Sequence, residues 1–296
     1  MRILLTENCN ARCPNCFNAS YREKRDMSIE NLKKVSKMLY AHGDRDIKIM
    51  GGEPTVHQNF FEAIEILRFY FESSNLFTNA LNDVILDYQP RESDTITYNF
   101  NFFGSSFNTR KFLLNSPGER HLEIQIASTT NPTFIIEKIK KVMLAFDGYK
   151  DFQINFTLNC MENIFSSREM IIPKWNEIIS FAESEKISWG VDHIIPECFY
   201  KGTDMIVPSE LGVCVPECAG LINSNLELLF CNQHPIVLHR FTDCTETKEQ
   251  VQQIIFSEFS VKQTLSFDNK CDGCDNYGKT CNGGCFMHKQ IYNANK

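Results

Sequence analysis

The sequence predicts an α/β fold in which a partial (β/α)6 barrel, similar to a TIM barrel, precedes a cysteine-rich C-terminal domain. Strand-like and helix-like segments alternate about six times through the first two thirds of the 296 residues, and such alternation is typical of parallel sheets with crossover helices. After about residue 207 these periods weaken, and eight of the thirteen cysteines lie from Cys214 onward. Metal ligation can replace a hydrophobic core in so small a region, so we expect a barrel over 1–205 and a second domain over 206–296.

Periodicity places the individual elements in order. Alternating or continuous apolar residues predict seven strands, at residues 2–6, 46–50, 75–78, 95–103, 122–127, 152–158 and 187–195. Apolar residues at helical spacing predict helices, at residues 28–40, 60–71, 80–87, 132–146 and 173–185. We expect Ser28 to cap the first helix and Pro132 to lie in the first turn of another. A six-stranded barrel needs one strand fewer, so either 95–103 or 122–127 is expected to be an insertion or an edge hairpin.

Composition narrows the classes of function. The formal net charge is −7 and the pI about 5.6, without a dense cluster of Lys and Arg, which disfavours a nucleic-acid partner and favours a peptide or small molecule. No apolar run approaches the roughly 18 residues of a membrane span, and no secretory signal precedes the first cysteines. We therefore expect a cytoplasmic protein without a membrane partner. In that reducing compartment, clustered cysteines hold metal more often than they form disulfides.

Three cysteines directly follow the first predicted strand. Cys9, Cys13 and Cys16 are spaced C-x3-C-x2-C, and three thiolates on one short loop can bind three irons of a [4Fe–4S] cluster and leave the fourth open. Zinc sites usually take four protein ligands arranged as two close pairs. A zinc loop completed by a distant residue is the alternative.

The strand followed by this loop resembles the opening of radical S-adenosylmethionine (radical SAM) enzymes. The resemblance implies that SAM chelates the open iron, that an electron donor such as flavodoxin or ferredoxin reduces the cluster, and that a 5′-deoxyadenosyl radical abstracts a hydrogen from the substrate. The family usually has an aromatic residue before the third cysteine, where this chain has Asn15, and here Phe17 follows that cysteine instead.

A second segment carries the same resemblance. Gly51, Gly52, Glu53 and Pro54 end the second strand and resemble the GGEP segment that contacts the SAM amino group in this family. Glycines allow the backbone to approach a ligand closely, and a carboxylate is a strong partner for an ammonium group. The run from Asn75 to Asn79 resembles the third-strand TNG segment, with Ala80 where glycine is usual.

Later strands supply further candidates. Residues 152–159 resemble the strand beside the SAM ribose, so Asn159 is a candidate contact, and a simple strand-terminating asparagine is the alternative. Cys160 is a tentative hydrogen-atom donor to a substrate radical, although a buried cysteine is commonly a small apolar residue. Asp192 and His193 are expected on opposite faces of a late strand, where one of them could touch substrate.

The C-terminal cysteines resemble the SPASM or twitch extension, which binds one or two auxiliary [4Fe–4S] clusters. By that pattern the first cluster is held by Cys214, Cys218, Cys231 and Cys285, and three irons of the second by Cys271, Cys274 and Cys281. The turn before Cys231 has Leu226 where the family has glycine. The second cluster lacks a fourth cysteine, so its last iron is open or is bound by another residue, for which the candidates are His288, Asp272 and Cys244. A form with one auxiliary cluster and a zinc ribbon are alternatives.

Relatives with this extension mostly modify ribosomal peptides or protein side chains by crosslinking, epimerisation or oxidation. The resemblance thus implies an oxidoreductase-like enzyme with a peptide substrate. Many peptide-modifying relatives carry an N-terminal domain that recognises the leader peptide. Only eight residues precede Cys9, so no such domain fits there, and the resemblance then implies a separate leader-peptide recognition protein. One alternative is a radical SAM dehydrogenase or epimerase of a small molecule such as a carbohydrate. Another is a non-catalytic iron–sulfur or zinc protein.

Overall fold

The computed structural model describes residues 1–13, 16, 25–99, 119–145, 152–159, 162–192, 195–208, 220–231 and 234–263, with 271, 273–277, 281, 285, 289 and 293 near the C terminus. The chain forms two compact units. The first contains Met1–His121 and Pro216–Glu258, and the second contains Leu122–Val215 and Phe259–Lys296. These units divide the chain by packing, whereas the boundary near residue 205 was drawn from cysteine content, and that boundary stays a prediction.

The first unit is built on a parallel sheet. Its strands β1 (Arg2–Thr6), β2 (Asp46–Gly51), β3 (Ser73–Thr78) and β4 (Thr95–Asn99) lie side by side in chain order. Apolar residues face one another across this sheet and are fully buried, namely Ile3, Ile49, Leu76 and Ile96. This register follows from the apolar runs in the sequence, because a one-residue slip would move every side chain to the other face.

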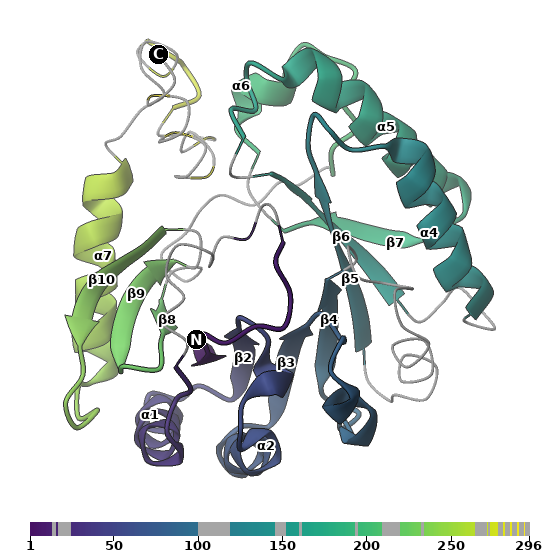
Figure 1. Ribbon diagram of the computed structural model, residues 1–296. Helices are drawn as coiled ribbons and strands as arrows, with labels where there is room; N and C mark the ends of the chain where they lie inside the picture. The colour runs from purple at the N-terminus through teal and green to yellow at the C-terminus, as the bar shows by residue number, and fades with distance from the viewer. Residues whose placement is uncertain are drawn as a thin grey trace. The chain divides into compact units, whose positions relative to one another are not determined.

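Helices cover the apolar face of this sheet. Figure 1 shows α1 (Ile29–Ala41) and α2 (Phe60–Tyr70) beside each other along it. Ser28 caps α1 as predicted, because its Oγ accepts a hydrogen bond of 3.1 Å from the Asn31 amide. Two short 3-10 helices, η2 (Pro54–Val56) and η3 (Asp83–Asp87), follow β2 and β3. The helix predicted at residues 80–87 is thus only partly formed.

A hairpin from beyond residue 205 completes this sheet. β8 (Leu221–Ile222) pairs in parallel with β1, and β9 (Glu227–Cys231) and β10 (His234–Arg240) continue it antiparallel. In the β8–β9 turn, Leu226 has a φ of +59°, a conformation that favours glycine. Its side chain is buried, and this burial offsets the backbone strain. Residues far apart in the sequence therefore share one sheet.

The second unit also contains parallel strands and helices. β5 (Glu119–Ile126) begins in the first unit and ends in the second, where β6 (Phe152–Leu158) and β7 (Ser188–Val191) follow it in order. Figure 1 shows α4 (Pro132–Ala145) and α5 (Arg168–Ser184) packed together. Two helices were not predicted, α6 (Glu197–Tyr200) and α7 (Lys248–Gln263).

Two predictions need correction. Strands β4 and β5, found at the candidate positions 95–103 and 122–127, both belong to the sheet, and β4 pairs in parallel with β3, so it is not an antiparallel hairpin on that strand. α5 begins five residues before Pro173, which lies inside the helix. Burial of Ile171 and Ile172 continues the apolar stripe on the amino-terminal side of the proline and outweighs the proline penalty.

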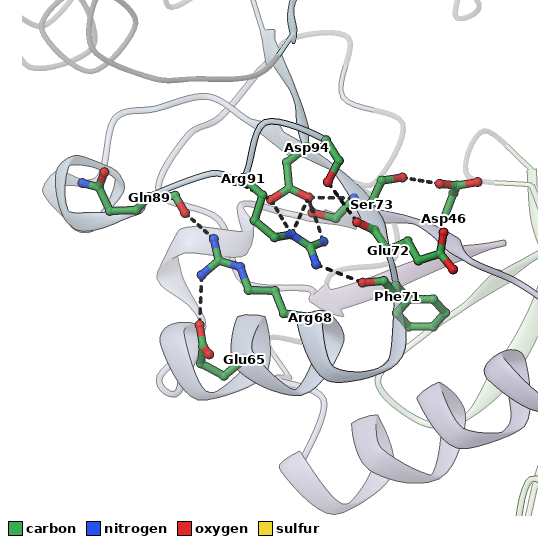
Figure 2. A network of polar contacts seen from close by, with 11 residues as sticks. Asp46, Glu65, Arg68, Phe71, Glu72, Ser73, Gln89, Arg91 and Asp94 are labelled. Carbon is green, nitrogen blue, oxygen red and sulfur yellow. Dashed lines mark hydrogen bonds and ion pairs between the residues drawn. The ribbon is translucent and has the colours of Figure 1, made fainter.

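A polar network secures the amino ends of the first unit's strands (Figure 2). The buried Asp94 carboxylate accepts hydrogen bonds of 2.9 Å from the amide and hydroxyl of Ser74 and pairs with Arg91 at 2.9 Å. Arg91 also donates to the Phe71 carbonyl at 3.0 Å. Burial alone would raise the pKa of Asp94, but the hydrogen bonds from Arg91 and Ser74 hold it below its usual value. The network ties the end of α2 to β3 and β4.

In the part of the chain that the structure describes, no helix is long and apolar enough to cross a bilayer.

Candidate active site

The three N-terminal cysteines lie on the loop that leaves the carboxyl end of β1. All three cysteines are half-buried. The loop turns tightly, because the Ala11 amide donates to Cys9 Sγ at 3.4 Å and the Cys16 amide donates to the Cys13 carbonyl at 3.3 Å. In a parallel β/α sheet this end of the strands carries the active site. Phe17 and Asn15 lie outside the described residues.

The glycine segment after β2 packs directly on this loop. The Gly52 amide donates to the Thr6 carbonyl and the Glu53 amide donates to the Asn8 carbonyl, both at 2.8 Å. A Cβ on Gly52 would lie 2.3 Å from the Asn8 oxygen and 2.8 Å from Cys9 Cβ. No side chain fits in that space, so the glycine is required by the close approach of two backbones.

The buried Glu53 side chain holds this segment in place through hydrogen bonds. Its side chain is 1% exposed. One carboxylate oxygen accepts from the hydroxyls of Thr55 and Thr78 at 2.7 Å, and the other accepts from the Asn79 amide at 2.6 Å. Burial raises the pKa of Glu53, and these hydrogen bonds oppose the rise. The carboxylate therefore links the end of β2 to the end of β3.

Asn79 continues this link to the cysteine loop. Its Nδ2 donates to Asn10 Oδ1 at 2.9 Å and approaches Cys9 Sγ at 3.9 Å. The next residue, Ala80, has a φ of +52°, which accounts for the glycine that is usual at this position of the segment. The Ala80 amide donates to Thr78 Oγ1 at 2.9 Å and fixes this turn.

A second set of contacts holds the start of the loop. Asp26 accepts from Thr6 Oγ1 at 2.5 Å and from Asn8 Nδ2 at 2.8 Å, and from the Gln58 amide at 3.1 Å. Burial is the largest influence on the pKa of Asp26 and would raise it, but these hydrogen bonds lower it overall. The buried His57 donates from Nε2 to the Met27 carbonyl at 2.9 Å, since its Nδ1 accepts from the Asn59 amide.

The three cysteines of this loop are a donor set that suits an iron–sulfur cluster. Soft thiolates from one short loop are typical of iron–sulfur proteins. Within the described ranges, no three His, Cys, Asp or Glu side chains converge closely enough for one ion.

In the second unit, Asn159 lies at the carboxyl end of β6. It is 6% exposed, and its amide donates to the Ile126 carbonyl at 2.9 Å. Cys160 and His193 lie outside the described residues. Asp192 follows the end of β7 instead of lying within a strand, and its amide donates to the Phe156 carbonyl at 3.0 Å. β7 is shorter than predicted, so the alternation argument does not place Asp192.

One carboxyl group in the second unit was missed by sequence reasoning. Glu123 alternates with Leu122 and Ile124, which are buried, so it lies on the other face of β5. Burial and the nearby charge of Asp192 raise the pKa of Glu123 to about 7. A glutamate within a strand gives no sequence signal of this kind, because the partner lies about 70 residues away.

The structure describes some of the C-terminal cysteines but not all of them. Cys231 ends β9 in the first unit and is half-buried. In the second unit the Cys274 amide donates to the Cys271 carbonyl at 3.1 Å, and the Cys281 amide donates to the Asn276 carbonyl at 3.0 Å. Cys285 is half-buried. The structure does not describe Cys214, Cys218, Asp272 and His288.

Cys244, a candidate fourth ligand of the second predicted cluster, is buried in the first unit. Burial, and then the charge of Glu246, raises the pKa of its thiol to about 11, which disfavours the thiolate form.

Known proteins resemble this chain in sequence and in fold. Residues 3–144 match the family model of the Radical SAM superfamily. A probable GTP 3′,8-cyclase of Pyrococcus horikoshii is 24% identical over 52% of this chain and 49% of its own length. The sporulation killing factor maturation protein SkfB of Bacillus subtilis is 24% identical over 66% of this chain and 55% of its own length. The chain thus spans about half the length of these curated relatives.

Among solved structures, SuiB of Streptococcus suis bound to its precursor peptide SuiA has the same fold. Its TM-score is 0.63 at 14% identity, and the match covers 97% of this chain and 71% of SuiB. SuiB has also been solved with bound S-adenosylmethionine. The likeness confirms the predicted α/β fold with its parallel strands, and it extends over the cysteine-rich C-terminal region.

Proposed function

Because residues 3–144 place this chain in the radical SAM superfamily, we propose that the protein is a radical SAM enzyme. It reductively cleaves S-adenosylmethionine and abstracts a hydrogen from its substrate. The observation that supports this most strongly is the packing of Gly52 against Asn8 and Cys9. This packing joins the two segments that the sequence assigns to the cluster and to SAM.

Cys9, Cys13 and Cys16 would hold the [4Fe–4S] cluster, and Gly51, Gly52, Glu53 and Pro54 would form the SAM-binding segment with Asn159 as a further contact. When bound, the cluster and SAM supply the electron and the 5′-deoxyadenosyl radical, which no side chain can provide. The glycines allow this segment to pack directly on the cysteine loop, because a Cβ on Gly51 or Gly52 would clash with the backbone of Thr6 or Asn8. Glu53 acts from within the protein, because its oxygens accept hydrogen bonds from Thr55, Thr78 and Asn79.

The substrate is proposed to be a ribosomal peptide or a protein side chain. The support comes from a relative named as a maturation protein of a sporulation killing factor and from a protein of the same fold that was solved with its precursor peptide. A leader-recognition protein and an electron donor such as flavodoxin or ferredoxin are the proposed partners. A small-molecule substrate is the alternative, because other relatives are GTP cyclases.

The remaining cysteines are proposed ligands of one or two auxiliary [4Fe–4S] clusters. Cys214, Cys218, Cys231 and Cys285 form one proposed set, and Cys271, Cys274 and Cys281 form another. A hydrogen-donor role for Cys160 stays a prediction.

The first test is anaerobic reconstitution with iron and sulfide, followed by measurement of iron per chain and of 5′-deoxyadenosine formed with SAM and a reductant. We expect about eight or twelve irons, four for each cluster, and SAM-dependent product. Cys13→Ala should abolish 5′-deoxyadenosine formation, whereas Cys198→Ala, which changes a cysteine outside the proposed ligand sets, should leave it intact. Zinc without iron, or equal activity of the two variants, would contradict the proposal.

The substrate class needs a separate measurement. Mass spectrometry of candidate precursor peptides incubated with the reconstituted enzyme should reveal a mass change that depends on SAM. Turnover of alcohols or nucleotides, with every peptide unchanged, would favour the small-molecule alternative.

A further inference from the structure

We propose that Asn79 is a positioning residue that holds the cysteine loop against the SAM-binding segment and stabilises the thiolate of Cys9. This inference rests on the proposed function, because it concerns the cluster that Cys9 would bind. Asn79 lies at the carboxyl end of β3, and it was singled out from sequence only as part of a supporting segment.

Asn79 contacts both segments of the candidate site. Its backbone amide donates to Glu53 Oε2 at 2.6 Å, and its side-chain Nδ2 donates to Asn10 Oδ1 at 2.9 Å. The same Nδ2 lies 3.9 Å from Cys9 Sγ. Asn79 thereby connects Glu53, which holds the glycine segment, to the loop that carries the three cysteines.

The orientation of the Asn79 amide is fixed by its surroundings. The Leu81 amide donates to Asn79 Oδ1 at 2.9 Å, so the oxygen must face Leu81 and the NH2 group must face the cysteine loop. The residue is 7% exposed, and water therefore competes little with these contacts. The donor is held in place before any ligand binds.

An N–H group facing a thiolate stabilises its negative charge. Hydrogen bonds to the sulfurs are among the factors that set the reduction potential of an iron–sulfur cluster, and loss of a partner outside the ligands typically costs 10–100-fold in metal affinity or activity. The hydrogen bond from Asn79 to Asn10 keeps the loop in place. The longer contact from Asn79 Nδ2 to Cys9 Sγ adds to the stabilisation of the thiolate. Removing Asn79 should loosen the cluster and make it harder to reduce.

The test compares three variants of the full-length, reconstituted protein. Asn79→Ala removes every side-chain contact. Asn79→Asp keeps an oxygen for the Leu81 amide but presents no donor to the loop, so it separates a folding role from the proposed one. Asn75→Ala is the matched control, because Asn75 lies on the same strand and its side chain accepts from Thr97 Oγ1 at 2.9 Å.

Two quantities would be measured: the rate of iron release to a ferrous chelator, and the midpoint potential of the cluster signal that SAM perturbs in electron paramagnetic resonance. We expect Asn79→Ala and Asn79→Asp to release the N-terminal cluster about tenfold faster and to shift its midpoint to more negative potential. Asn75→Ala should match the wild type in both.

Two results would overturn the inference. One is an Asn79→Ala protein that matches Asn75→Ala in both measurements. The other is an Asn79→Asp protein that behaves as wild type while Asn79→Ala does not. That result would mean that Asn79 acts only by accepting the hydrogen bond from the Leu81 amide. A wild-type cluster that forms but does not respond to SAM would instead contradict the proposed function, and iron release would still test Asn79.

Discussion

Glu53 in the first unit and Glu123 in the second both have a raised pKa, but their surroundings differ. Glu53 is buried under hydrogen bonds from two threonine hydroxyls and two backbone amides. For Glu123, burial is joined by the charge of Asp192, and both disfavour the ionised form. The first carboxylate is part of a rigid brace, whereas the second titrates near neutral pH. The hydrogen bonds of Glu53 therefore hold the candidate cofactor site in place, whereas the protonation of Glu123 changes with pH.

The glycines of the two units test this difference most strongly. Gly52→Ala forces a Cβ against the backbone of Asn8, which cannot move without displacing the cysteine loop. We expect a loss of roughly 3 kcal/mol in the free energy of unfolding and failure to retain iron. The Cβ of Gly190→Ala meets the flexible end of Gln153 at 3.2 Å and Asn155 Oδ1 at an ordinary 3.8 Å, so this change should cost less than about 1 kcal/mol. Thermal unfolding and iron analysis would check both, and equal losses would contradict the contrast.

Replacing Glu53 with glutamine should weaken the hydrogen bonds that link the ends of β2 and β3. The amide keeps one acceptor but turns an N–H group toward a backbone N–H or a threonine, and an unsatisfied buried donor costs about 1–3 kcal/mol. Urea unfolding of Glu53→Gln at pH 8 should therefore show a less stable protein. Thr97→Ser, a conservative change elsewhere in the sheet, serves as control. A variant as stable as the wild type would show that the hydrogen bonds do not brace the site.

Glu123→Gln should have the opposite sign and a smaller effect. The folded-state pKa of Glu123 is about 7, above the unfolded value of about 4.3. The folded protein therefore binds the extra proton between these values, and its stability falls as pH rises from about 4.5 to 7. Since Glu123 is half-buried, we expect Glu123→Gln to stabilise the protein by about 1–2 kcal/mol at pH 8.

The same variant should make little difference at pH 4.5, where Glu123 is protonated in the folded state. Unfolding at both pH values measures this change. A stabilisation that is equal at pH 4.5 and pH 8 would show that the charge of Glu123 is not its cause.

Local sequence determined much of the fold and of the predicted cluster loop. Apolar periodicity located the strands β1 to β3 and the cap at Ser28, because these depend on neighbouring residues. The spacing of Cys9, Cys13 and Cys16 indicated the metal chemistry, since three thiolates on one turn suit few other groups. The helix start predicted at Pro173 was wrong, because burial of a longer apolar stripe outweighs the local helix-breaking preference of proline.

Only the tertiary structure decided which distant residues support that loop. Asp26 contacts Thr6 and Asn8 across about 20 residues, and Asn79 contacts Asn10 across 69. The hairpin β8–β9 joins β1 from more than 200 residues away. No periodicity encodes these partners, because side-chain hydrogen bonds depend on where separate strands end in space. The sequence alone therefore predicted which atoms could bind a cluster, and the packing of the strand ends decided how those atoms are held.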